Sequence, residues 1–352
     1  MRQSETKGAP RAYRYGVELT RSEPFFWMNG VLAYRLLEIS NNPASLDDGG
    51  FWAISTTFEG EWICAKFAEV VHAPLPPALN IWEKIESAWH TSIERERYIA
   101  YVREIQNHIS RGWVYQVNAC RQLSTRCEKE TDLLPLMHEI LLSNPAPHAS
   151  YLRLPELQIA SASPELFLRR EKAVVTSGPI KGTNSAGDVN FGDKDKAENI
   201  MIVDLIRNDL GKICKPGSVH VPRLLAAEIH PGLTHLVSDI QGTLREDITW
   251  TQIGEALLPP GSVSGAPKSS ALDVIKEHED MPRGPYCGAL GWVHGDSANL
   301  AVAIRTFWNS GDGYLRFGTG AGITWGSDAS KEWDETVLKA ARLISIAGGE
   351  IL

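Results

Sequence analysis

The feature that most constrains the fold of this chain is the order of its helix-like and strand-like segments, as judged by the spacing of their apolar residues. A helix repeats its apolar residues at intervals of three and four, whereas a strand alternates them, so the two patterns can be distinguished. Here strand-like segments come in runs, and single helical segments separate these runs. This order is typical of an α+β protein with large, mostly antiparallel sheets, and it lacks the regular alternation of a doubly wound fold.

The strongest helical period covers residues 94–111, where Tyr98, Tyr101 and Ile105 share one face and Gly112 follows as a terminator. Further helices are predicted over residues 195–210, 250–257, 269–278 and 331–346. Strands are predicted over residues 113–119, 150–154, 158–162, 166–169, 173–177, 235–241, 286–293, 299–308 and 314–320. Residues 70–80 are rich in Pro and are predicted to connect a strand-rich part (1–80) to a larger part (90–349).

Composition excludes several classes of protein. The net charge of −8 and the lack of a basic run argue against a nucleic-acid partner. The five cysteines form no C-x-x-C pair, so neither a zinc site nor a disulfide framework is indicated, and a reducing compartment fits best. No apolar run reaches 18 residues and no signal peptide is evident, so we expect a cytoplasmic protein with no membrane partner.

Two pairs of carboxylates stand at helical spacing. Asp195 and Glu198 are three residues apart in one predicted helix, and so are Glu332 and Glu335 in another. Residues at this spacing share a helix face. Two such helices could therefore build an all-oxygen site suited to Mg²⁺. A solvated, charged helix face explains the same pattern equally simply.

Lys181 lies in a constrained segment, with Gly178 and Pro179 before it and Gly182 after it. A turn of this kind can hold an amine rigidly near a ligand, and a buried lysine can have its pKa lowered enough to act as a nucleophile. Taken alone, the segment is equally compatible with a lysine on a solvent-facing turn.

Three further features suggest a binding site for an anion. Residues 318–322 are rich in Gly and are predicted to form a turn whose backbone N–H groups can bind a carboxylate. Ser262 lies in a second rigid loop, and Arg305 interrupts an apolar strand, where burial without a partner is costly. His235 also lies in an apolar strand, although a histidine in such a position is more commonly a core residue with its ring nitrogens hydrogen-bonded.

Taken in order, these segments resemble the chorismate-utilising enzymes, and the resemblance covers residues 95–347, roughly three-quarters of the chain. The matching blocks are SPELF, PIKGT, AENIMIVDLIRNDLG, THLVS, PPGSVSGAPK, RGPYCGALG, AIRT, GAGI and EWDET. The resemblance implies an α+β fold, a large two-lobed antiparallel-sheet sandwich with outer helices. It also implies that residues 90–349 form the chorismate-binding catalytic domain.

The resemblance also implies roles for individual residues. Glu198 and Glu335 correspond to direct Mg²⁺ ligands, with Asp195 and Glu332 supporting the ion through water. Lys181 is the implied nucleophile and Glu165 the general acid, while His235 polarises or positions that region. The implied substrate-binding residues are Ser262, Tyr286, Arg305, Gly320, Ala321, Gly322 and Lys339.

Two positions distinguish the reactions of this family. Relatives that add water to chorismate carry a lysine base where this chain has Gln116, so isochorismate and salicylate synthases are disfavoured. Anthranilate synthases carry alanine where this chain has Lys181, whereas aminodeoxychorismate synthases carry lysine. The resemblance is therefore closest to aminodeoxychorismate synthase component I, which aminates chorismate at C4 on the way to 4-aminobenzoate.

The expected partner is a separate glutaminase subunit that supplies ammonia, because no Gly-x-Cys-x-Gly elbow is present. The alternatives are an anthranilate synthase component I and a non-catalytic subunit that binds chorismate or tethers the glutaminase. In many relatives a front segment helps to bind tryptophan; here the similar residues 36–40 carry an inserted Ile39, which makes such binding doubtful.

Overall fold

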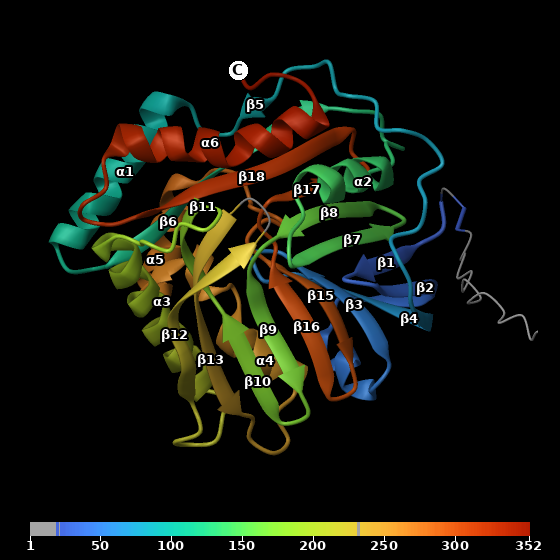
Figure 1. Cartoon of the computed structure of the whole chain (residues 1–352), viewed down its shortest axis with the longest axis horizontal. Coiled ribbons are helices and arrows are strands. Elements are labelled where there is room, and N and C mark those ends of the chain that lie inside the picture. The colour runs from blue at the N-terminus through green and yellow to red at the C-terminus, as the bar shows by residue number, and fades with distance from the viewer. Residues whose placement is uncertain (1–18, 21, 231–232) are drawn as a thin grey trace, which may run out of the picture.

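A computed structural model describes residues 19–20, 22–230 and 233–352 (Figure 1), so residues 1–18 of the predicted N-terminal part lie outside the described residues. Its strands are β1 (Phe25–Met28), β2 (Val31–Ser40), β3 (Phe51–Thr56), β4 (Trp62–His72), β5 (His90–Thr91), β6 (Gln116–Arg126), β7 (His148–Leu154), β8 (Leu157–Ser163), β9 (Leu166–Glu171), β10 (Val174–Gly178), β11 (Ile180–Ser185), β12 (His220–His230), β13 (Leu233–Thr243), β14 (Gly265–Ala266), β15 (Ala289–His294), β16 (Ser297–Val302), β17 (Thr306–Asn309) and β18 (Tyr314–Ile323). Its helices are α1 (Arg95–Ser110), α2 (Leu134–Ser143), α3 (Asp193–Gly211), α4 (Trp250–Leu257), α5 (Lys268–His278) and α6 (Ala329–Ala347), with short 3₁₀ turns η1 (Pro43–Asp48) and η2 (Gly261–Val263).

The strands form one continuous antiparallel ribbon. Its neighbours run in the order β6, β18, β17, β8, β7, β1, β2, β4, β3, β15, β16, β9, β10, β13 and β12. Strand β11 continues β10 along the same edge of β13, and the short β5 and β14 pair with β6. The N-terminal strands β1 to β4 therefore lie in the middle of the ribbon.

Helices cover the outer surfaces of this ribbon. Helix α6 packs on β18 and α1 packs on α6, while α3 packs on β13 and β11 (Figure 1). The buried apolar side chains form two separate clusters, one around Trp52 and Ile240 and the other around Trp89 and Phe307. The expected fold, an α+β sandwich of antiparallel strands with outer helices, is confirmed. Among the described residues, no helix has the length and apolar character needed to span a membrane.

Several element boundaries differ from the sequence predictions. The predicted strand over residues 299–308 is two strands, because the chain turns at Arg305, whose φ of 52° is incompatible with an extended ladder. Helix α2 and strands β11 and β12 were not predicted. Residues 70–72 belong to β4, so the Pro-rich connector begins only after His72.

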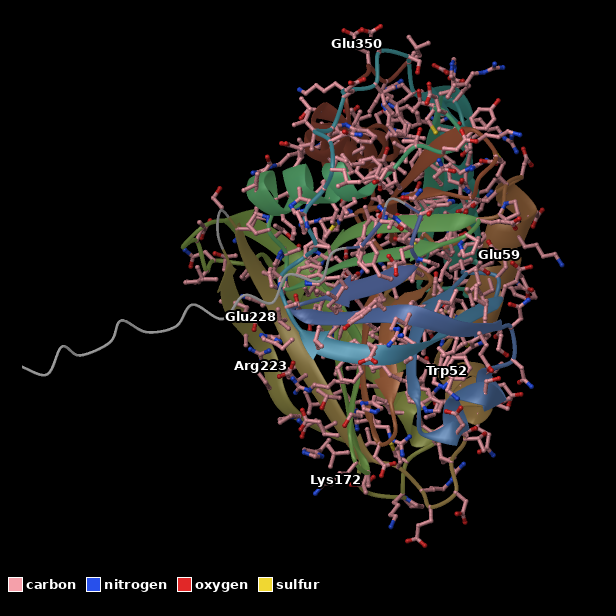
Figure 2. The ribbon with its side chains drawn as sticks, turned by 90° about the vertical axis from the view of Figure 1, so that its right-hand side faces the viewer. Trp52, Glu59, Lys172, Arg223, Glu228 and Glu350 are labelled. Atoms are coloured by element: carbon pink, nitrogen blue, oxygen red, sulfur yellow. The ribbon has the colours of Figure 1, made fainter. Side chains whose placement is uncertain are left out.

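A buried ion pair joins distant parts of the chain. The guanidinium of Arg283 donates to both carboxylate oxygens of Glu279 at 2.7 Å, and to the backbone oxygens of Val263 at 2.9 Å and Asn118 at 2.7 Å. At the β3–β4 turn, Glu59 accepts the backbone N–H of Arg283 at 2.7 Å (Figure 2). These bonds tie the N-terminal strands to the loop that precedes β14.

We predict that Arg283→Met lowers the free energy of unfolding by about 3–5 kcal/mol, because it leaves the Glu279 carboxylate buried without its cation. Urea unfolding followed by circular dichroism measures the change. The matched control is Arg97→Met, which removes the neighbouring but exposed pair with Asp280 and should cost less than about 1 kcal/mol. Equal losses in the two variants would contradict the prediction.

Candidate active site

Lys181 projects from an irregular point of β11. The register between β11 and β13 shifts between Ile180 and Thr183, so the residues between them form a bulge. Gly182 has a φ of +81°, and a Cβ there would lie 2.9 Å from the ring of Phe191. A bulge redirects a side chain out of the regular alternation of a strand. The segment predicted as a turn is thus a bulged strand, and the bulge sets the direction of the Lys181 side chain.

The amine of Lys181 lies where the two ends of the ribbon meet. Its Nζ donates to the backbone oxygen of Ser262 at 3.4 Å. The same Nζ lies 3.7 Å from the point where a Cβ on Gly322 of β18 would be. Burial lowers the pKa of Lys181, and the positive charge of Lys339 acts in the same direction, while the carboxylates of Glu198 and Glu165 oppose the shift.

Gln116 lies beside this amine. Its Nε2 is 2.2 Å from the same Cβ position of Gly322, so a side chain at that position would displace the amide. Gln116 is 1% exposed, and neither its amide nitrogen nor its amide oxygen has a hydrogen-bond partner in the described part of the chain. A buried polar group without a partner is costly, so the arrangement favours a polar ligand at this point.

Glu165 connects β8 to β9 and is 5% exposed. Its backbone is fixed on both sides, because its N–H donates to Ser163 Oγ at 3.2 Å and its oxygen accepts from the N–H of Val302 at 3.0 Å. Burial raises the pKa of its carboxyl from 4.5 to about 7, although a hydrogen bond with Ser262 and the charge of Lys181 oppose the shift. Glu165 can therefore carry a proton near neutral pH.

The predicted metal ligands lie on α3 and α6. The ammonium of Lys194 is 3.8 Å from Glu198 Oε1 and 3.8 Å from Glu332 Oε1, so it bridges the two helices. Glu198 Oε1 is buried and has no hydrogen-bond partner among the described residues, so it relies on this ion pair with Lys194. An orphaned carboxylate oxygen beside a second carboxylate, with a cation between them, fits a site for a hard cation such as Mg²⁺.

The four carboxylates differ in their surroundings. Burial raises the pKa of Glu198 and of Glu332, and each also feels other carboxylates. For Glu335, burial raises the pKa, but Lys339 at 2.6 Å and the other cations outweigh it and leave the pKa lowered. Asp195 Oδ2 accepts from the N–H of Gly192 at 3.3 Å and so caps the start of α3.

These carboxylates do not converge tightly. Within the described ranges, the group of three potential metal-ligating residues with ligand atoms within 4.8 Å of one another is found elsewhere, on α1 and α5. Mg²⁺ commonly uses one or two carboxylates together with waters and substrate oxygens, so a looser set is sufficient.

The other predicted binding residues line β18 and its surroundings. Gly320, Ala321 and Gly322 continue the strand rather than forming the predicted turn, and they pair with β6 on one edge only, since β17 pairs no further than Phe317. Lys339 Nζ donates to the oxygen of Gly320 at 3.1 Å. On the opposite edge, no described strand pairs with this segment beyond Phe317.

Arg305 provides an uncompensated cation. Burial lowers its pKa and the charge of Arg342 lowers it further, and its guanidinium has no hydrogen bond or ion pair within the residues described. A half-buried cation without an anionic partner favours an anionic ligand, and a guanidinium suits a carboxylate.

Tyr286 and His235 contact different parts of the candidate site. The ring of Tyr286 packs against Gly318, where a Cβ would lie 2.0 Å from it, and its hydroxyl accepts from Cys120 Sγ at 3.8 Å. Gly318 is four residues before Gly322, or about 13 Å along the strand. On β13, buried His235 Nδ1 lies 3.0 Å from the hydroxyl of Thr183.

We predict that Glu165→Gln alters how stability depends on pH. Because the folded pKa of about 7 lies above the unfolded value of 4.5, ionising Glu165 costs folding free energy as pH rises between them. The free energy of unfolding of the variant, relative to that of the native protein, should therefore rise by on the order of 3 kcal/mol between pH 4.5 and 7. Urea unfolding across this range measures the gain. The control is Glu246→Gln, at an exposed residue. If the difference in free energy of unfolding from the native protein is independent of pH for both variants, the prediction is wrong.

Comparison with known proteins identifies the family. The sequence model of the family described as chorismate binding enzyme matches residues 55–345. This chain therefore belongs to the chorismate binding enzyme family.

Relatives with two different activities are about equally similar to it. Anthranilate synthase component 1 of Saccharolobus solfataricus is 36% identical over 281 residues, which cover 76% of this chain and 66% of that protein. Aminodeoxychorismate synthase component 1 of Salmonella typhimurium is 34% identical over 273 residues, covering 74% of this chain and 60% of that protein. The chain thus spans about two thirds or less of the length of these relatives.

The fold is shared with a solved structure. The isochorismate synthase DhbC of Bacillus anthracis, described as putative and specific for 2,3-dihydroxybenzoate, superposes with a TM-score of 0.77 at 19% identity, and the match covers 94% of this chain and 97% of that chain. This likeness extends to the architecture alone.

Proposed function

We propose that this protein aminates chorismate at C4 to give 4-amino-4-deoxychorismate, with Lys181 as a covalent nucleophile. The observation that carries the proposal is the position of the Lys181 amine. It lies between Gln116 and Gly322 of one ribbon end and Ser262 of the neighbouring loop, and its pKa is lowered. A lowered pKa increases the fraction of neutral amine, which is the nucleophilic form of lysine.

The residues divide the reaction into two displacements. In the first, the neutral amine of Lys181 forms a bond to C2 of the ring, the ring double bonds shift, and the C4–O bond breaks. Glu165 gives its proton to the departing oxygen, which leaves as water. In the second, ammonia forms a bond to C4, the double bonds shift back, and the C2–N bond to Lys181 breaks. The sum is chorismate plus ammonia giving aminodeoxychorismate plus water.

A Mg²⁺ ion would be held by Glu198 and Glu335, with Glu332 and Asp195 in support, and when bound it would neutralise the ring carboxylate of chorismate. The second carboxylate of the substrate would bind Arg305, since that guanidinium has no hydrogen-bond or ion-pair partner among the residues that the structure describes. Backbone N–H groups of the open β18 edge would complete its binding. Lys339, at 2.6 Å from Glu335, would keep that carboxylate ionised.

Ammonia is proposed to come from a separate glutaminase subunit. A glutaminase of the cysteine type needs an accessible thiolate. Four of the five cysteines are buried here, and burial raises the pKa of the Cys64 thiol to about 12 and that of Cys214 to about 11. The remaining thiol, Cys127, is half-buried and its pKa is also raised, chiefly by burial. The cysteines therefore do not favour an internal glutaminase.

Two other functions compete with this proposal. Amination at C2, as in anthranilate synthases, is favoured by sequence similarity as much as amination at C4 is, but Lys181 would obstruct the approach of ammonia to C2. A tethering subunit without activity would not need to keep an acid of raised pKa beside an amine of lowered pKa. We expect the reaction to take place in the cytoplasm as a step towards 4-aminobenzoate.

We predict that Lys181→Ala lowers the rate of 4-amination by roughly a thousandfold or more, because the covalent route is lost. The assay contains chorismate, Mg²⁺ and ammonium, and chromatography identifies the product. Lys215→Ala, on the surface, is the control and should retain the native rate. In the native protein, denaturing mass spectrometry during turnover should detect an adduct on Lys181 equal to chorismate less one water. Anthranilate as the native product, or an unchanged rate in the variant, would overturn the assignment.

We also predict that Lys194→Met tightens Mg²⁺ binding by about fivefold, because the ammonium competes with the ion for Glu198 and Glu332. Isothermal calorimetry with Mg²⁺ alone measures the affinity without any need for turnover. The control is Lys196→Met, which removes an exposed charge two residues further along the same helix. Equal or weaker binding in the Lys194 variant would show that the ammonium does not stand in for the ion.

A further inference from the structure

We propose that His108, Glu277 and His278 form a binding site for a divalent transition-metal ion, separate from the carboxylates of α3 and α6. Their potential ligand atoms all lie within 4.8 Å of one another. His108 comes from α1, and Glu277 and His278 from α5, so the ion would join two helices that are far apart in sequence. In Figure 1 both helices lie on the same side of the molecule.

Side-chain movement alone can bring the three ligand atoms to the separations found around a bound metal ion. Bonds from Zn²⁺ to imidazole nitrogen and carboxylate oxygen are about 2.0–2.2 Å, which places tetrahedral ligand atoms roughly 3.4 Å apart. Because the present ligand atoms all lie within 4.8 Å of one another, their separations have to shorten by at most about 1.4 Å. Glu277 is exposed and can turn about its side-chain bonds, so the backbone need not shift.

One ligand ring is already held in place. His278 stacks on Tyr101 with ring centroids 4.9 Å apart and an interplanar angle of 26°. Tyr101 is buried, and its hydroxyl donates to Glu279 Oε1 at 3.3 Å, which is the carboxylate that binds Arg283. The imidazole is thus positioned through Tyr101 by the buried ion pair of Arg283 and Glu279, and pre-positioned ligands lose less entropy when they bind.

Helix direction also favours a cation at this point. His108 lies in the last turn of α1 and His278 in the last turn of α5. The carboxyl end of a helix carries partial negative charge, which attracts cations over the distance of one turn. Two helices end at this cluster, so both ends act together with the Glu277 carboxylate.

The ligand set indicates the class of ion. Two imidazoles and one carboxylate suit Zn²⁺, Co²⁺, Ni²⁺ or Cu²⁺, whereas Mg²⁺ prefers oxygen ligands alone. Three protein ligands leave a fourth position for water. The bound ion would join α1 to α5, whose other end begins at Lys268, just after the loop that holds Ser262. We therefore expect it to stabilise this side of the protein.

Calorimetric titration of the full chain with Zn²⁺, in excess Mg²⁺ to saturate the other carboxylates, tests the proposal. We expect one Zn²⁺ per chain, a Tm that rises with Zn²⁺ concentration, and a Co²⁺ complex with visible d–d bands. His108→Ala and His278→Ala should each weaken Zn²⁺ binding by at least about tenfold. His220→Ala, on an exposed strand residue, is the matched control and should leave binding unchanged.

Glutamine variants keep the test decisive if an alanine variant fails to fold. His108→Gln and Glu277→Gln retain the size of the side chain while weakening or removing the metal ligand, and circular dichroism checks that they fold. Native Zn²⁺ affinity in the folded His108 and His278 variants would overturn the proposal, and so would the absence of any Zn²⁺-dependent rise in Tm. Because Zn²⁺ binding is measured without chorismate, the outcome does not depend on the proposed amination.

Discussion

The site depends on the closure of a single antiparallel ribbon. One end of this ribbon is β6 and β18, with β5 and β14 paired on β6, and the other is β10, β11, β13 and β12; the remaining strands lie between them. The ends are brought together so that Lys181 of β11 lies beside Gly322 of β18 and Gln116 of β6. Lys181 meets Gln116 and Gly322 only because both ends come together, so the candidate site is complete only in the closed sandwich.

The same closure brings the two carboxylate helices together. Helix α3 follows β11 and α6 follows β18, so each end of the ribbon carries its own pair of carboxylates. Lys194 on α3 then reaches Glu332 on α6, and Lys181 experiences the charges of both helices. The proposed metal ligands and the proposed nucleophile are consequently positioned by one packing arrangement, because both follow from where β11 and β18 lie.

Elements whose conformation is decided by their own local sequence could be predicted, whereas those decided by distant partners could not. The helix of residues 95–110 has a clear local period, and its limits were predicted to within a residue. Strand β12 contains Pro222 and lacks clean alternation, and its partner β13 decides its conformation, so local pattern could not find it. The break at Arg305 was hidden because apolar residues continue on both sides of it.

The candidate site shows the same limit. Lys181 in its own segment looked like a turn residue, and only its match to an ordered set of motifs marked it as functional. Its neighbours Gly322 and Gln116 come from strands more than sixty residues away in sequence, so no local pattern could reveal that they meet. The pairing of His108 with Glu277 and His278 gave no sequence signal at all, because two helices supply it.

The protonation states of Lys181 and Glu165 are linked by burial rather than by attraction. Each charge favours the ionised form of the other, as in an ordinary ion pair, yet burial is the largest influence on both. It lowers the pKa of the amine and raises that of the carboxyl, so it favours the neutral form of each. A neutral amine beside a protonated carboxyl is the state that the proposed first displacement would need, because one group would attack and the other would give up a proton. An exposed salt bridge of the same residues would hold both groups in the wrong form.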